Sequence, residues 1–191
     1  MRGQAHTVEA FVAAMLIVGG LIFATQATAV TPLSASTSNQ HIENQQQASI
    51  EGLLATAAEN GDLQAAVLNW DPEEGEFDNL SKQGTYENEP PNEFVVALNQ
   101  TLTERQIAFN VDVRYAEPDG TSDTERMVEM GQPSNNAVTA TWTVSLYENS
   151  TLSSGGNEEE TLQDSEFYAD NIDTDSELYT VVEVEVTAWR K

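Results

Sequence analysis

Four acidic residues near the C-terminus have the side chains and the spacing to bind a cation. Asp170, Asp173, Asp175 and Glu177 lie within the stretch DNIDTDSE, and closely spaced carboxylate oxygens are ligands that Ca²⁺ prefers. The stretch lacks the central glycine of an EF-hand loop and a properly placed closing glutamate. We therefore interpret it first as a solvated acidic turn, with a calcium site as the alternative. We assign no metal ion and no cofactor to the chain.

The residues that usually carry out catalysis are scarce. The chain has no cysteine and two histidines, His6 and His41, and neither histidine has a partner at catalytic or metal-binding spacing. No histidine follows residue 41, which leaves the C-terminal part without a Ser-His-Asp triad. Phosphate-binding loops, dinucleotide fingerprints and nucleophile elbows are missing too. A carboxylate pair can serve a glycosidase, but any such pair is uninformative among 32 acids. We predict that the protein is not an enzyme.

Acidic side chains dominate the charge of the chain. There are 32 acidic and 7 basic residues, giving a formal net charge of -25, and the only lysines are Lys82 and Lys191. This charge excludes nucleic acid as a partner, because phosphate binding needs Lys and Arg. Molar salt screens carboxylate repulsion to within about 3 Å. The composition thus indicates a protein built for high salt, as in halophilic archaea, and the alternative is an ordinary acidic surface protein.

A long apolar segment near the N-terminus predicts a helix that crosses a membrane. Residues 8–30 are mostly apolar and have no polar side chain from Ala10 to Ala24. A helix of that length would span roughly 34 Å, enough for a bilayer. Arg2 precedes the segment, and the next basic residue is Lys82. The positive-inside rule then predicts a cytoplasmic N-terminus and an extracellular C-terminal part. The expected localisation is single-pass in the cell membrane, with membrane lipid as a partner.

Three fates of this segment are open. Ala27-Thr28-Ala29 fits the A-x-A cleavage site of a secretory signal peptide, and cleavage there would release a secreted domain. An uncleaved segment would be a plain anchor. A prepilin-type segment would instead be cut before the apolar helix and would keep that helix.

The residues before the apolar segment resemble a known processing signal. Arg2-Gly3-Gln4, a short polar spacer, Glu9 and a long apolar helix look like the class III signal of archaeal type IV pilins and of haloarchaeal pilin-like proteins. The resemblance implies cleavage between Gly3 and Gln4 and packing of the retained helix in a filament core. It also implies that Glu9 pairs with the terminal amine of a neighbouring subunit. Glu9 lies one residue beyond the usual family position, and it also fits the first turn of a helix capped by Thr7.

Further along the chain, helical and loop patterns alternate. Residues 31–70 predict a polar stalk that becomes helical from Ile50, because apolar residues recur there on one helical face. Residues 71–91 are rich in Gly, Pro and acidic residues and predict a loop. Pro90-Pro91-Asn92 marks a helix start, and the apolar spacing after it predicts a helix over about 92–105.

After residue 106 the hydropathy pattern has a period of two, which is typical of strands. Alternation predicts strands over 107–115, 138–146 and 178–189, and a weaker strand over 126–130. A long acidic connection occupies residues 148–176. Clean alternation implies an antiparallel sheet with one wet face, so we expect a helix on the other face.

These elements together predict an α+β protein. We expect an N-terminal transmembrane helix followed by a small head with about four antiparallel strands and one or two packed helices. The expected domains are a cytoplasmic N-terminus over 1–7, a transmembrane helix over 8–30, a polar stalk and helix over 31–70, and an extracellular α+β domain over 71–191.

Three N-x-S/T sequons are candidate glycosylation sites, at Asn79, Asn99 and Asn149. Asn79 and Asn149 fall in predicted loops, where a glycan is sterically easy to attach. Asn99 falls inside a predicted helix and is the weaker candidate.

The resemblance and the residue patterns together favour a structural function. We expect a membrane-anchored extracellular pilin-like subunit or accessory of a cell-surface filament, with like subunits or pilin-type subunits as partners. The alternatives are a non-polymerising single-pass surface protein that binds a partner or ligand, and a secreted domain released by signal cleavage.

Overall fold

The chain folds into two compact units, Met1–Ile42 and Glu43–Lys191. The computed structural model describes residues 11–18, 21, 31–81, 84–85, 90–153 and 160–190. The first unit holds a helical segment over residues 11–18 and the beginning of α2 (Thr31–Asn60), and α2 continues into the second unit. We call the second unit the head.

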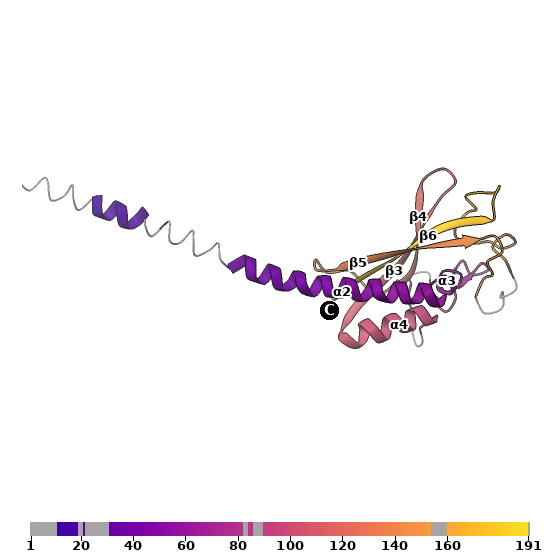
Figure 1. The fold of residues 1–191 in the computed structure, drawn as a ribbon, viewed down its shortest axis with the longest axis horizontal. Helices are drawn as coiled ribbons and strands as arrows, with labels where there is room; N and C mark the ends of the chain where they lie inside the picture. The colour runs from indigo at the N-terminus through magenta and orange to yellow at the C-terminus, as the bar shows by residue number, and fades with distance from the viewer. Residues whose placement is uncertain are drawn as a thin grey trace, which may run out of the picture. The chain divides into compact units, whose positions relative to one another are not determined.

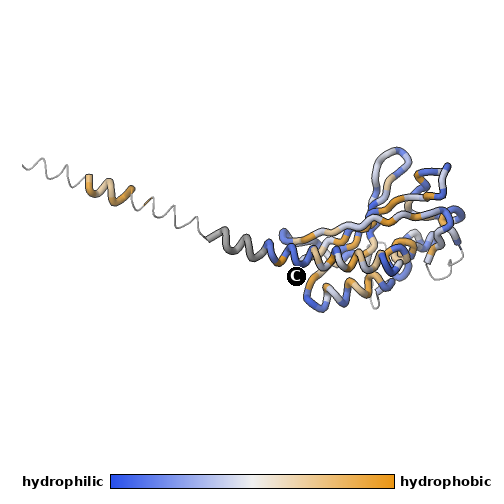
Figure 2. Tube along the Cα trace, viewed as in Figure 1, coloured by the Kyte–Doolittle hydropathy of each residue, from blue (hydrophilic) through white to orange (hydrophobic). Residues whose placement is uncertain are grey.

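A four-stranded antiparallel sheet forms the centre of the head (Figure 1). Its strands are β3 (Ile107–Ala116), β4 (Ser122–Glu129), β5 (Val138–Tyr147) and β6 (Leu178–Arg190), in the order β4-β3-β6-β5. Apolar and polar residues alternate along β5 and β6 (Figure 2). Because successive side chains point to opposite faces, this pattern gives the sheet one apolar and one polar face. β5 and β6 pair over Val138↔Ala188 through Trp142↔Val184, so that whole rows of like side chains share a face.

Helices cover the apolar face of the sheet. Besides α2 they are α3 (Asp62–Val67), α4 (Glu93–Leu102) and the 3₁₀-helix η1 (Thr103–Arg105). The predicted helix start at Pro90-Pro91-Asn92 is confirmed, because the Asn92 side chain accepts a hydrogen bond of 3.0 Å from the Val95 backbone N–H and so caps α4. The left-handed backbone of Gln106 (φ 62°) then ends the helical run before β3.

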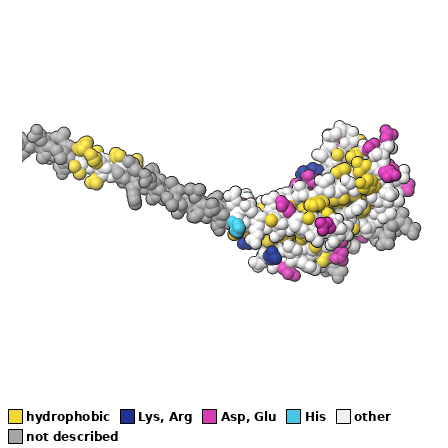
Figure 3. All heavy atoms as spheres, viewed as in Figure 1, with side chains coloured by type: hydrophobic (Ala, Val, Ile, Leu, Met, Phe, Trp, Pro, Cys, Tyr) yellow, Lys and Arg dark blue, Asp and Glu magenta, His cyan; other side chains and the backbone are white. Residues whose placement is uncertain are grey.

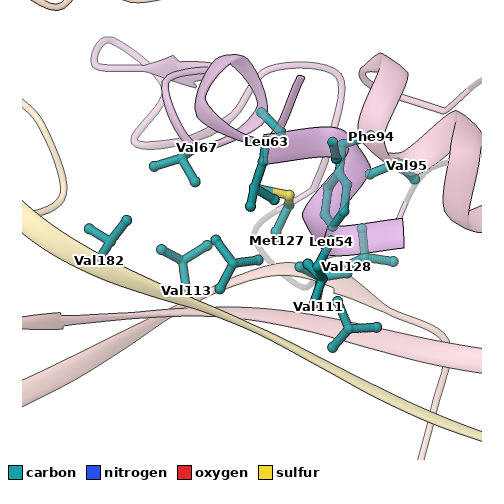
Figure 4. Close-up of a cluster of buried hydrophobic side chains, with 14 of the residues drawn as sticks. Leu54, Leu63, Val67, Phe94, Val95, Val111, Val113, Met127, Val128 and Val182 are labelled. Atoms are coloured by element: carbon teal, nitrogen blue, oxygen red, sulfur yellow. The ribbon is translucent and has the colours of Figure 1, made fainter. Parts of the chain in front are cut away.

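The core lies between these helices and the sheet (Figure 4). Leu54 of α2, Leu63 of α3 and Phe94 of α4 are completely buried and point toward the sheet. Val111 and Val113 of β3 are equally buried on the other side of this layer. Burying one such side chain contributes roughly 1.5–3 kcal/mol, so this apolar layer is the main source of the stability of the head.

A small second sheet overlaps the predicted loop 71–91, so that prediction was incomplete. β1 (Trp70–Asp71) and β2 (Glu76–Phe77) form a two-stranded antiparallel hairpin. Trp70 and Phe77 are buried and meet edge to face, with ring centroids 5.4 Å apart. Tyr168 packs 5.1 Å from Trp70, and its hydroxyl donates a 3.3 Å hydrogen bond to the Val67 carbonyl.

The acidic connection over residues 148–176 is held onto the head along its described residues. Leu152, Leu162 and Ala169 are buried, and Thr151 and Thr161 form an isolated β-bridge. The Ser153 hydroxyl donates a 2.8 Å hydrogen bond to the Ala65 carbonyl of α3. Apolar residues spaced along this segment therefore anchor it to the helical layer.

The predicted fold class and localisation need correction. In the part of the chain that the structure describes, no helix combines the length and apolar character required to cross a bilayer. This finding corrects the predicted transmembrane helix and the predicted single-pass membrane localisation. Most of the predicted span over 8–30 lies outside the described residues. In its described residues, the α+β fold has six strands in two sheets instead of about four strands.

Candidate functional site

The helical residues 11–18 present large apolar side chains to solvent. Phe11, Leu16 and Ile17 are 62%, 72% and 70% exposed, and Met15 and Val18 are also more than half exposed. Apolar colouring covers this whole segment in Figure 2. A helix that is apolar on all sides needs apolar partners around it, and exposed apolar patches of this kind mark interaction sites. We call residues 11–18 the apolar helix.

The polar face of the sheet carries two arginines, and both are paired with carboxylates. Arg114 lies 3.1 Å from Glu183 and 3.5 Å from Glu185 across the β3–β6 pair. Arg126 lies 2.8 Å from Asp112 across the β3–β4 pair and also pairs with Glu129 at 3.0 Å. Because these side chains are partly exposed, each pair contributes at most about 1 kcal/mol. Their main effect is to neutralise carboxylates that would otherwise repel one another across the strands.

A shallow hollow of about 360 Å³ lies on this polar face beside Arg114. Ser122, Thr143 and Glu183 also line it. Arg114, the cationic side chain that lines the hollow, is already paired with Glu183 at 3.1 Å. An anionic ligand would have to compete with that carboxylate. The hollow therefore gives no argument for a ligand.

Carboxylates gather around Tyr115 near the end of β3. Burial, together with the negative charges of Asp123, Glu125, Glu117 and Asp170, raises the pKa of the Tyr115 hydroxyl to about 12. Glu125 lies in β4 opposite Val113, on the helix-covered side of the sheet. Burial, together with the charge of Asp123, raises the pKa of the Glu125 carboxyl. The carboxylates around Tyr115 therefore lower the free energy of unfolding of the head when they are ionised.

Replacing Glu125 with glutamine is expected to stabilise the head at neutral pH and low salt. A carboxyl whose pKa is raised by folding stabilises the folded state only while it is protonated. That contribution is lost as the pH rises through the folded-state pKa. Glu125→Gln removes the charge and should raise the free energy of unfolding by about 0.2–1 kcal/mol, the range for exposed charge interactions. Urea unfolding monitored at pH 7 measures the change.

The control is Glu104→Gln, which removes the same charge from an exposed position in η1. Only the Glu125 variant should be stabilised, and its advantage should shrink in molar salt and vanish below pH 4. Equal effects of the two variants would mean that net charge, and not the group around Tyr115, controls stability.

The candidate calcium stretch forms an exposed turn. Asp170, Asp173, Asp175 and Glu177 are all exposed, and the Asp173 carboxylate accepts the Asp175 backbone N–H at 3.3 Å. Among the residues that the structure describes, no group of three or more His, Asp or Glu side chains is placed to hold a metal ion. The interpretation as a solvated acidic turn and the alternative of a calcium site both stay predictions.

The sequons differ in their surroundings. Asn79 is exposed, with a left-handed backbone (φ 60°), in the turn after β2. Asn149 is exposed in the turn after β5. Asn99 lies within α4, where its side chain accepts a 3.0 Å hydrogen bond from the Thr103 hydroxyl. Solvent exposure makes Asn79 and Asn149 the better candidates for glycosylation, as the sequence predicted. Glycosylation itself stays a prediction.

The predicted processing residues Gly3 and Gln4, and the predicted pairing residue Glu9, lie outside the described residues. Their roles stay predictions. His41 lies exposed in α2. Sequence reasoning found the apolar helix, but it missed the arginine pairs and the carboxylates around Tyr115. The partners in these groups lie up to 71 residues apart along the chain, so only the strand register brings them together.

Comparison with known proteins gives a family but no activity. The model of one family matches residues 2–188, and that family is described as a family of unknown function, DUF7288. No curated protein and no solved structure matches the chain.

Proposed function

Because the chain belongs to the family DUF7288, whose function is unknown, we propose a function from its own residues. The protein is a structural subunit of the pilin-like type, which assembles with copies of itself by packing their apolar helices together. The observation that carries this proposal is the apolar helix itself, whose large side chains are more than half exposed in the single chain.

The sequence around the apolar helix supports the same function. No polar side chain occurs from Ala10 to Ala24, so a buried position in an assembly would leave no charge or hydrogen-bonding side chain without a partner. Arg2-Gly3-Gln4 resembles the processing signal of archaeal pilins, which frees a new amine close to the helix. Glu9 is then the nearest carboxylate for a neighbouring subunit's amine.

The architecture of the head is compatible with such a subunit. A long helix, α2, runs from the first unit into the head, where its residues pack on a four-stranded antiparallel sheet. Pilins share this general plan, although many unrelated domains do too. Acidic side chains are spread over the visible face of the head, with few basic ones among them (Figure 3). Such a surface keeps the heads hydrated, while the apolar helices provide the contact within the filament.

Determining the mature N-terminus tests the proposal. Mass spectrometry of the protein purified from expressing cells should find a chain that begins at Gln4, and electron microscopy of the same material should show filaments. A chain that begins at Val30 would have lost the apolar helix and would overturn the proposal. So would a chain that begins at Gln4 but stays monomeric at every salt concentration from 0.1 to 4 M.

A further inference from the structure

The two edges of the four-stranded sheet are built differently. β4 forms one edge and β5 the other. Along β4, Asp123, Glu125, Arg126 and Glu129 are charged, and the Gly84 carbonyl accepts a 2.7 Å hydrogen bond from the Glu129 backbone N–H. Charges and a covering loop are the usual means by which proteins block pairing at a sheet edge. The β4 edge is therefore protected.

The β5 edge has neither kind of protection along its described length. Its sequence, VTATWTVSLY, contains no charged residue and no proline, although the chain as a whole has a net charge of -25. The other three strands of this sheet all carry charged residues. In the described part of the head, β6 is the one strand that pairs with β5. The other edge of β5 thus offers a row of backbone N–H and C=O groups.

An exposed tryptophan lies at the middle of this edge strand. Trp142 belongs to the row that faces the helices, since it pairs with the buried Val184 of β6. In the same row Ala140 and Leu146 are buried and Val144 is partly buried, but Trp142 is 37% exposed. The helical layer therefore leaves part of the Trp142 ring uncovered beside an open strand edge.

We propose that the open edge of β5 is a homodimer interface, where β5 of a second copy adds antiparallel and continues the sheet through a two-fold axis. An interface of this kind is self-complementary, so the same strand must suit both sides. The apolar rows coincide only in registers that place even-numbered residues opposite even-numbered ones, because side chains alternate between faces. The register that centres Trp142 on Trp142 of the second copy pairs residues 138–146 along their whole length.

The distribution of charge favours pairing of two copies at the β5 edge and disfavours it at the β4 edge. Two chains of charge -25 repel each other, and like charges directly opposite in a sheet are destabilising. A β5–β5 contact places no carboxylate opposite another. A β4–β4 contact would bring the carboxylates of Asp123 and Glu125 close to those of the second copy. The central tryptophans would form an aromatic pair over the two-fold axis, which covers the exposed ring surface.

Cross-linking of single cysteines in the full chain tests the interface. In the proposed register Thr141 lies opposite Thr143 of the second copy, with Cβ atoms about 4.5–5.5 Å apart. Both residues are exposed, and the chain has no cysteine of its own. An equimolar mixture of Thr141→Cys and Thr143→Cys chains should form disulfide-linked dimers several-fold faster than either variant alone. The control is Thr124→Cys in the exposed part of β4, which should not cross-link.

Equal rates for the mixture and for the separate variants would overturn the proposed interface, and so would an equal rate for Thr124→Cys. The wild-type chain supplies a second measurement. Backbone amides of residues 138–146 should gain protection from hydrogen exchange as the protein concentration rises, and unchanged exchange would also contradict the proposal. Ile17→Lys, which disrupts packing of the apolar helix, should leave the β5 cross-link intact, so this test fails or succeeds independently of filament formation.

Discussion

Replacing Gly84 with alanine is expected to lower the free energy of unfolding by about 2–5 kcal/mol, the sum of two costs. Gly84 has a left-handed backbone (φ +72°), which costs a residue with a Cβ atom roughly 1–2 kcal/mol. Its added Cβ would also lie 2.9 Å from the Glu129 backbone nitrogen and 3.0 Å from Cγ of Arg126. Overpacking of this kind typically costs about 1–3 kcal/mol.

The position of Gly84 explains why the neighbours cannot easily move. Its carbonyl accepts a 2.7 Å hydrogen bond from Glu129, and its own N–H donates a 2.7 Å bond to the Ser81 carbonyl. A shift that relieves the clash stretches the bond to β4 and disturbs Arg126, which holds Asp112 at 2.8 Å. The substitution therefore loosens the protected edge of the sheet as well as the turn.

Gly75 provides a matched control for this prediction. It also has a left-handed backbone (φ +65°), but nothing lies within 4 Å of its added Cβ. Gly75→Ala should show the conformational cost alone, so thermal unfolding of the two variants separates strain from the clash. Equal losses in the two variants would mean that the Gly84 turn does not press against β4.

The sequence predicted the strands whose faces are clearly separated. Alternation placed β3, β5 and β6 within a residue or two of their observed bounds, because each has a buried row and a polar row. β4 was placed at 126–130 but spans Ser122–Glu129. Its charged residues and the register shift beside Val111 obscure the alternation, and edge strands commonly carry such features.

Other features depend on contacts that no local pattern reveals. β1 and β2 have two residues each, too few for a period, and they form because Trp70 and Phe77 pack together and against Tyr168. Arg114 and its partner Glu185 come from β3 and β6, which are brought together only by the sheet register. The apolar segment was visible from its composition, but composition alone could not decide what covers it.

Replacing Ile17 with lysine is expected to abolish filament formation by the full chain while the head stays folded. Ile17 is 70% exposed in the apolar helix, so the single chain tolerates a charge at this position. Packed among the apolar helices of neighbouring copies, the ammonium group would be buried without a partner, which costs several kcal/mol. Because every subunit contributes the same contact, that cost recurs at each copy and filaments should disappear. Sedimentation and electron microscopy measure the loss.

A control variant and a stability measurement separate the loss of the assembly contact from unfolding of the head. Ile17→Leu retains an apolar side chain of similar volume and should still assemble, since such exchanges are tolerated best. Thermal unfolding of the head should be unchanged in both variants, because residue 17 belongs to the first unit and the core of the head begins at Ile50. Filaments of Ile17→Lys that match the wild type in length and number would show that the apolar helix is not the assembly contact. That result would reject the proposed function. The proposed β5 interface would be unaffected, because cysteine cross-linking tests it separately.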